Sequence, residues 1–160
     1  MYTLIKNDSV MSFDPITRIH VGGQELLVRN EIAKADSVFI SAPQPVEQNL
    51  SVSRDGIAAA LRIAPDEISE NHRIANINAG LSTLIVPIDS LITLLSLHPD
   101  QQHLKEFCLA NGIEIICVFS TETSSAGNRY RTRVFAPVFG YLEDPATGSG
   151  NAALGYYLLK

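Results

Sequence analysis

The residues best suited to chemistry stand near the end of the sequence, in the run Glu143-Asp-Pro-Ala-Thr-Gly-Ser-Gly150. Gly148 and Gly150 open an alanine- and leucine-rich segment that is expected to be helical, and a glycine without a Cβ lets a ligand come close to the backbone. The first N–H groups of a helix have no partner within the helix and carry partial positive charge. We therefore predict that this turn binds a carboxylate or a phosphate.

Three polar side chains extend the predicted anion site. Thr147 and Ser149 offer hydroxyl donors, and Asp144 holds a carboxylate at the rim, next to the rigid Pro145. A helix cap in a tight turn without any ligand would use the same residue types. The helix expected over about residues 147–159 favours a binding site. Its small apolar body predicts burial on all sides, and a buried helix start with unpaired polar groups is unfavourable.

Strands dominate the elements that would position this turn, with helices between them. Alternating or β-branched runs predict strands, and N-caps followed by apolar periodicity predict helices. The predicted strands cover residues 2–6, 17–21, 25–28, 37–41, 74–78, 83–88, 113–120 and 130–136, and the predicted helices cover residues 53–62, 90–97, 100–111 and 147–159. Without a Rossmann or phosphate-loop motif, this order predicts an α+β fold with a mostly antiparallel or mixed sheet.

Three arginines alternate at the last predicted strand. Arg129, Arg131 and Arg133 would share one side of it. Such a row is either a cationic surface for an anionic substrate or the solvated face of a strand, and we favour the solvated face.

Composition excludes several classes of function. The sequence has 12 Lys and Arg against 17 Asp and Glu, and this net charge of −5 argues against nucleic-acid binding, which needs clustered basic residues. No run approaches the roughly 18 apolar residues that span a membrane. The first residues also lack a signal-peptide pattern. We therefore expect a cytoplasmic protein with no nucleic-acid and no membrane partner.

The cysteines and histidines do not form a metal-binding pattern. Cys108 and Cys117 lie in apolar stretches, which predicts buried thiols in a reducing compartment. None of the four histidines stands at ligand spacing from a cysteine or from another histidine. We predict no metal site.

The turn also carries a resemblance to a known family, the PhzF-like isomerases of the phenazine-biosynthesis type, which have the diaminopimelate epimerase-like fold. The family's second-half signature combines a strand, a loop and a helix, and this sequence matches it closely. Weaker matches lie upstream. The matching segments are Phe135-Ala-Pro137 with Glu143-Asp-Pro-Ala-Thr-Gly-Ser-Gly-Asn-Ala-Ala-Leu154, then Asn78-Ala-Gly-Leu-Ser-Thr-Leu-Ile-Val-Pro-Ile-Asp-Ser-Leu91 and Val38-Phe-Ile-Ser-Ala-Pro43.

The resemblance implies a fold and a reaction. In this family a sheet wraps a buried central helix in each of two halves, and the active site lies between the halves. The implied activity is isomerisation of a small carboxylate-bearing substrate by proton transfer at carbon, without a cofactor. Asp144 would be the catalytic residue that orients an amino or hydroxyl group, and Thr147, Gly148 and Ser149 would bind the substrate. Thr147 stands where related epimerases carry a catalytic cysteine, which disfavours two-thiol racemisation.

The sequence also departs from the family pattern. The first-half motifs Gly-Asn-Pro and Gly-His-Pro and the general acid/base glutamate have no counterpart, and the strands that follow the central helix are absent after Lys160. We therefore expect residues 1–160 to form a single, incomplete second-half domain that supplies one wall of an active site and is inactive alone. Its exposed sheet edge predicts a homo-oligomer or a complementing subunit.

Two further interpretations stay open. In the first, the chain is an inactive half-domain that binds small anions or pairs with a partner subunit. In the second, it is a non-functional remnant.

Overall fold

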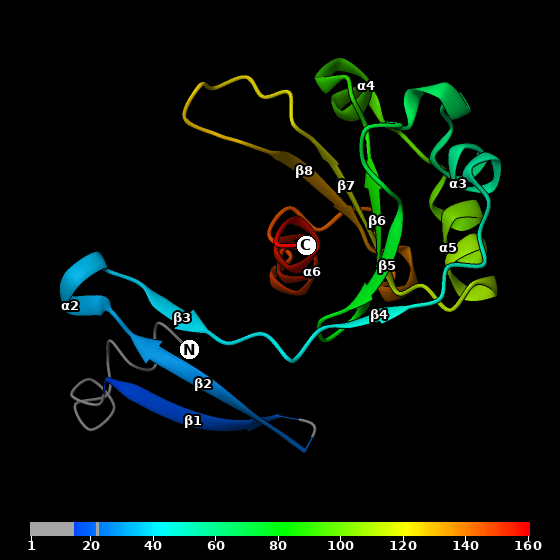
Figure 1. Ribbon diagram of the computed structural model, residues 1–160. Coiled ribbons are helices and arrows are strands. Elements are labelled where there is room, and N and C mark those ends of the chain that lie inside the picture. The colour runs from blue at the N-terminus through cyan, green and yellow to red at the C-terminus, as the bar shows by residue number, and fades with distance from the viewer. Residues whose placement is uncertain (1–14, 22) are drawn as a thin grey trace. The chain divides into compact units, whose positions relative to one another are not determined.

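The computed structural model describes residues 15–21 and 23–160, and it mixes helices and strands throughout, which confirms the α+β class (Figure 1). The chain divides into two compact units, residues 1–44 and residues 45–160, a division that no feature of the sequence predicted. That residues 1–160 form a single second-half domain stays a prediction. The strand predicted over residues 2–6 lies outside the described residues.

The first unit contains a three-stranded antiparallel sheet in the order β1-β2-β3. Its elements are β1 (Ile16–Val21), β2 (Gln24–Asn30), the one-turn helix α2 (Ile32–Ala35) and β3 (Val38–Ile40). The predicted hairpin is confirmed, because Val21 pairs with Gln24 and Gly23 has a φ of +80° that favours glycine. Val28 is the one fully buried side chain that the described part of this unit contains.

The second unit is built on a five-stranded mixed sheet in the order β4-β5-β6-β7-β8. The strands are β4 (Val46–Gln48), β5 (Ala75–Asn78), β6 (Ser82–Pro87), β7 (Ile115–Ser120) and β8 (Arg131–Phe135). β6 and β7 run parallel, and the other neighbouring pairs run antiparallel, as the sequence predicted for a mostly antiparallel or mixed sheet. β8 is one edge of this sheet, and this edge carries the site.

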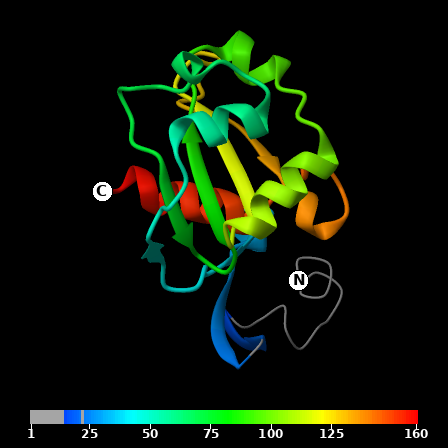
Figure 2. The same cartoon turned by 90° about the vertical axis from the view of Figure 1, so that its right-hand side faces the viewer.

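Helices cover both faces of the five-stranded sheet (Figures 1 and 2). Three helices share one face and bury a core against β6, β7 and β8. They are α3 (Arg54–Leu61), α4 (Leu91–Ser96) and α5 (Gln101–Ala110). Short 3₁₀ helices, η2 (Pro65–Glu67) and η3 (Pro137–Phe139), join neighbouring elements.

The predicted starts of these three helices are confirmed by their caps. The side chains of Ser53, Ser90 and Asp100 each accept a hydrogen bond from a backbone N–H in the first turn. Each cap satisfies one N–H group that the helix itself leaves without a partner.

Helix α6 (Gly148–Leu158) packs on the opposite face of the sheet. The buried row along it consists of Gly150, Ala153, Leu154 and Tyr157. Gly148, Asn151 and Gly155 are exposed, so the prediction of burial on all sides is wrong for the described structure. A helix that lies on one face of a sheet contacts the sheet with one side only. The small apolar residues of α6 allow its backbone to come close to the sheet on that side.

Gly150 is a point of close contact between α6 and β8. A Cβ at this position would lie 3.2 Å from Val134 Cγ2 and 3.3 Å from Thr147 Cγ2. Gly155 lies further along α6, and a Cβ there would meet nothing within 4 Å. The two glycines therefore differ in how much space surrounds them.

We expect Gly150→Leu to destabilise the protein by about 1–3 kcal/mol, because added methylenes must displace the packed neighbours. Gly155→Leu is the matched control, and we expect it to stabilise by up to about 1 kcal/mol through helix propensity. Urea unfolding followed by circular dichroism measures both. Equal effects of the two substitutions would contradict the packing of α6 against β8.

Candidate functional site

The turn that carries Asp144 is held against the outer edge of β8. The Asp144 N–H donates to the Val134 carbonyl at 2.9 Å, and the Ala136 N–H donates to the Leu142 carbonyl at 3.0 Å. Residues 142–144 therefore run antiparallel beside the end of the strand. This pairing gives the turn a fixed place on the sheet.

The Asp144 carboxylate faces outward from this turn with one oxygen unused. Its Oδ1 accepts a hydrogen bond from the Ala146 N–H at 3.1 Å, and Oδ2 has no hydrogen-bond partner among the described residues. The side chain is half-buried. Asp144 can therefore accept a hydrogen bond from a ligand without losing its own contact with the turn.

Thr147 is the N-cap of α6, and it stabilises the turn from inside. It is buried, and its hydroxyl donates to the Asp144 carbonyl at 3.2 Å. Its own carbonyl accepts the Asn151 N–H at 3.2 Å and the Asn151 Nδ2 at 2.8 Å. The substrate-binding role predicted for Thr147 stays a prediction, and its hydroxyl is already used by the turn.

The start of α6 leaves three backbone donors without partners. The N–H groups of Gly148, Ser149 and Gly150 have no acceptor among the described residues. Gly148 is exposed and Ser149 is half-exposed, while Gly150 is buried. The predicted anion site at Gly148 and Ser149 therefore keeps free, accessible donors, and ligand binding there stays a prediction.

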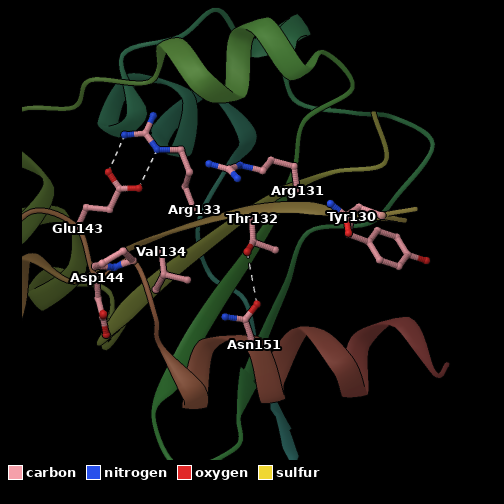
Figure 3. A pocket seen from close by; sticks show the side chains of 10 residues that line it. Tyr130, Arg131, Thr132, Arg133, Val134, Glu143, Asp144 and Asn151 are labelled. Atoms are coloured by element: carbon pink, nitrogen blue, oxygen red, sulfur yellow. Dashed lines mark hydrogen bonds and ion pairs between the residues drawn. The ribbon is translucent and has the colours of Figure 1, made fainter. Parts of the chain in front are cut away.

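A pocket of about 310 Å³ lies beside the turn, at the edge of the sheet (Figure 3). Asp144 lines it, whereas Thr147, Gly148 and Ser149 do not. The lining residues come from the β7–β8 loop, β8, the turn and α6: Asn128, Tyr130, Arg131, Thr132, Arg133, Val134, Glu143, Asp144, Pro145 and Asn151. The structure thus brings only one of the four predicted site residues into the pocket.

Thr132 and Asn151 line this pocket and were not predicted from the sequence. The Thr132 hydroxyl donates to Asn151 Oδ1 at 3.4 Å, which joins β8 to the first turns of α6 (Figure 3). Asn151 lies within the family-like run, and its position after the two glycines was the available signal. Thr132 gave none, because strand alternation does not show which neighbour a side chain will meet.

The three arginines of the alternating row do not behave alike. Arg133 is only 14% exposed and forms an ion pair with Glu143, so its predicted place on a solvated strand face is wrong. Arg131 is exposed, and among the described residues its side chain makes no hydrogen bond or ion pair. Arg131 thus supplies a cation at the pocket.

Arg133 holds Glu143 in the ionised form. Its Nε and Nη2 donate to the two carboxylate oxygens of Glu143 at 2.9 Å and 2.7 Å. This bidentate bond lowers the pKa of Glu143 below its ordinary value of 4.5, and the charge of Arg131 acts in the same direction. Glu143 is therefore an anion at neutral pH, and both of its carboxylate oxygens are occupied by Arg133.

The two cysteines are free and fully buried, as predicted. Burial raises the pKa of Cys108 and of Cys117 to about 12, because a thiolate is poorly solvated in the core. Neither thiol can act as a base near neutral pH.

Within the described residues no group of three or more His, Cys, Asp or Glu could hold a metal ion. No helix of that part is long and apolar enough to cross a membrane.

We expect Glu143→Gln to show a pH-dependent loss of stability. A carboxylate whose pKa is depressed in the folded state stabilises the fold above its ordinary pKa of 4.5, and this contribution is lost as the pH falls through the folded value. The parent chain should exceed the variant in free energy of unfolding at pH 7, and the difference should shrink toward pH 3. Urea unfolding at several pH values measures it, with Glu106→Gln on α5 as the control. A difference that is the same at pH 3 and pH 7 would contradict this assignment.

We expect both thiols to resist modification in the folded protein. With a pKa of about 12, almost no thiolate is present at pH 8, and burial also blocks the reagent. An aromatic disulfide reagent should therefore react slowly with the native chain and quickly with two thiols after unfolding in guanidinium. Fast reaction of the native chain would contradict the buried, inert state.

Known sequences that are similar to this chain include isomerases. It is 32% identical over 128 residues to the trans-2,3-dihydro-3-hydroxyanthranilate isomerase of Pseudomonas chlororaphis, covering 77% of this chain and 40% of that protein. It is 31% identical over 106 residues to an uncharacterized isomerase of Clostridium acetobutylicum, covering 66% of this chain and 35% of that protein. The chain thus spans less than half the length of these curated relatives.

Solved structures show the shared fold. The phenazine biosynthesis protein of the PhzF family from Bacillus anthracis superposes with a TM-score of 0.83 at 18% identity, covering 99% of this chain and 54% of that one. A predicted epimerase of Pseudomonas aeruginosa gives a TM-score of 0.73 at 17% identity, with 99% and 53% covered. The predicted diaminopimelate epimerase-like fold is confirmed. Residues 9–160 match the family model for phenazine biosynthesis-like proteins, so the chain belongs to this PhzC/PhzF family.

Proposed function

We propose that this chain supplies one wall of a cofactor-independent isomerase site, which moves a proton at carbon in a small carboxylate-bearing substrate. Family membership and the isomerase names of its relatives support the reaction class. The proposal rests on the arrangement of polar groups at the start of α6. A carboxylate with a free oxygen, Asp144, stands beside a helix start whose N–H groups at Gly148 and Ser149 have no partner in the described structure.

These groups could bind both the carboxylate and the amino or hydroxyl group of a hydroxy acid or an amino acid. The free N–H groups of Gly148 and Ser149 would hold the substrate carboxylate, helped by the partial positive charge of the α6 start. Asp144 Oδ2 would accept a hydrogen bond from the substrate's amino or hydroxyl group and so orient the reacting carbon. Thr147 would support both by keeping Asp144 and the helix start in place.

The proton carrier itself is proposed to lie outside this wall. Isomerisation needs a group that removes a proton from one carbon and returns it to another while the double bond shifts, so the atoms balance without a cofactor. Both carboxylate oxygens of Glu143 are bonded to Arg133, and both cysteines have a pKa of about 12, so none of them fits this role. By family resemblance the carrier is a glutamate of the other half of the site.

A second candidate function is a half-domain that binds small anions or pairs with another subunit, either a second copy or a complementing half. The exposed side of α6, with Gly148, Asn151 and Gly155, favours such pairing. A small apolar helix commonly packs against a second surface. A cytoplasmic location stays a prediction that rests on the two reduced cysteines.

Substitutions at the helix start test the binding half of the proposal. Gly148→Pro removes one N–H donor at the first helical position, where proline is tolerated, and Thr147 already has the extended backbone (φ −67°, ψ 109°) that precedes proline. Gly148→Ala keeps the donor and is the matched control. We expect Gly148→Pro and Asp144→Asn to weaken binding of trans-2,3-dihydro-3-hydroxyanthranilate by about tenfold or more, since each loses a charge-assisted hydrogen bond.

Calorimetric titration measures these affinities, and deuterium incorporation from heavy water measures turnover. We expect binding but no turnover by the 160-residue chain alone. Turnover by this chain would contradict the one-wall proposal. Equal affinity of the Gly148→Pro and Gly148→Ala variants would show that the helix start does not hold the carboxylate.

A further inference from the structure

One guanidinium at the edge of the sheet joins three segments of the chain. Besides its two bonds to Glu143, Arg133 donates through Nη1 to three carbonyl oxygens at the end of α4. These belong to Leu94 at 3.1 Å, Leu95 at 3.2 Å and Leu97 at 2.8 Å. The side chain also lies over the Phe135 ring, 5.0 Å from its centroid. A side chain with this many contacts is fixed in one orientation.

The end of α4 explains why an arginine stands at this position. The last carbonyl groups of a helix have no partner within it and carry partial negative charge. α4 has only six residues, and Arg133 supplies the donors that its end lacks. Lysine has a single ammonium and could not cap these carbonyls while also making a two-bond contact with a carboxylate.

The same guanidinium contacts one of the two neighbouring carboxylates of the turn. Glu143 and Asp144 are neighbours, and Figure 3 shows their carboxylates on different sides of the backbone, with Glu143 toward Arg133 and Asp144 away from it. The backbone bond from Asp144 to Val134 fixes the position of the turn along β8. The Arg133–Glu143 pair adds an anchor on one side, which leaves Asp144 to face the other.

We propose that Arg133 is a positioning residue for the Asp144 site: it anchors Glu143 to the end of α4 and thereby fixes the side of the turn on which Asp144 stands. The ligand that Asp144 receives rests on the proposed function, but the anchoring concerns this chain alone. The competing explanation is that Arg133 only adds to overall stability. The two explanations differ in which part of the chain is destabilised when Arg133 is replaced.

Hydrogen exchange of single amides in the full chain separates these explanations. The Asp144 and Ala136 N–H groups report on the turn, because both close the pairing with β8. The Ile88 N–H, which donates to the Phe119 carbonyl at 2.8 Å, reports on the central strands β6 and β7 and is not part of the turn. For Arg133→Lys and Arg133→Gln we expect about tenfold faster exchange at the turn, with a smaller change at Ile88.

A matched control exists in Arg54, whose guanidinium also donates to three carbonyl oxygens. They belong to Pro65, Ile68 and Ser69, away from the turn. Arg54→Lys should leave the turn amides unchanged. Glu143→Gln keeps Arg133 and weakens only the anchor, so it should speed exchange at the turn even if the Arg133 variants fold poorly.

Three outcomes decide the matter. Exchange that is accelerated more at the turn than at Ile88 supports the proposal. Equal acceleration at the turn and at Ile88, or no acceleration at the turn, would overturn it. Titration of the same variants with trans-2,3-dihydro-3-hydroxyanthranilate then asks whether anchoring changes affinity. If the parent chain binds none of this probe, the proposed function fails, while the exchange result still decides the role of Arg133.

Discussion

Two backbone hydrogen bonds at the outer edge of β8 hold the turn that carries Asp144 in place, one from Asp144 to Val134 and one from Ala136 to Leu142. Strand edges present unpaired donors and acceptors, and here the protein's own chain occupies part of that edge. The start of α6, the pocket and the Arg133–Glu143 pair are all placed by this short antiparallel contact. Without it the segment between β8 and α6 would be an ordinary surface loop.

The residues around this contact are held by close packing on one side and by an ion pair on the other. Gly150 lets α6 come close to Val134, so the open helix start reaches the level of the turn. Thr147 is buried between them and ties its hydroxyl to the Asp144 carbonyl. On the other side, Glu143 is held ionised by the guanidinium of Arg133. The turn is therefore fixed from both faces of the sheet, while Asp144 Oδ2 and the first N–H groups of α6 have no partner among the described residues.

Local features were predictable from the sequence, and contacts between distant segments were not. The helix starts at Ser53, Ser90 and Asp100 were predicted because the signals that begin a helix are neighbours in sequence, and all three residues turn out to be caps. The family-like run located Asp144 and the start of α6. Alternation placed Arg133 on a strand but could not show that α4, some 36 to 39 residues away, would end against it. Burial of α6 was overestimated, since small residues indicate close packing without stating on how many sides.

The β7–β8 connection has a different character from the turn opposite it. It is mostly exposed, and local hydrogen bonds hold residues 123–128. The Thr123 hydroxyl donates to the Ser125 and Asn128 carbonyls, and the Asn128 N–H donates to the Ser125 carbonyl at 3.0 Å. Yet Asn128 and Tyr130 line the pocket from this side. Exposed loops accept insertions and substitutions far more readily than paired backbone does. Substitutions in this loop can therefore change one wall of the pocket at little cost in stability, whereas substitutions at the Asp144 wall would disturb paired backbone.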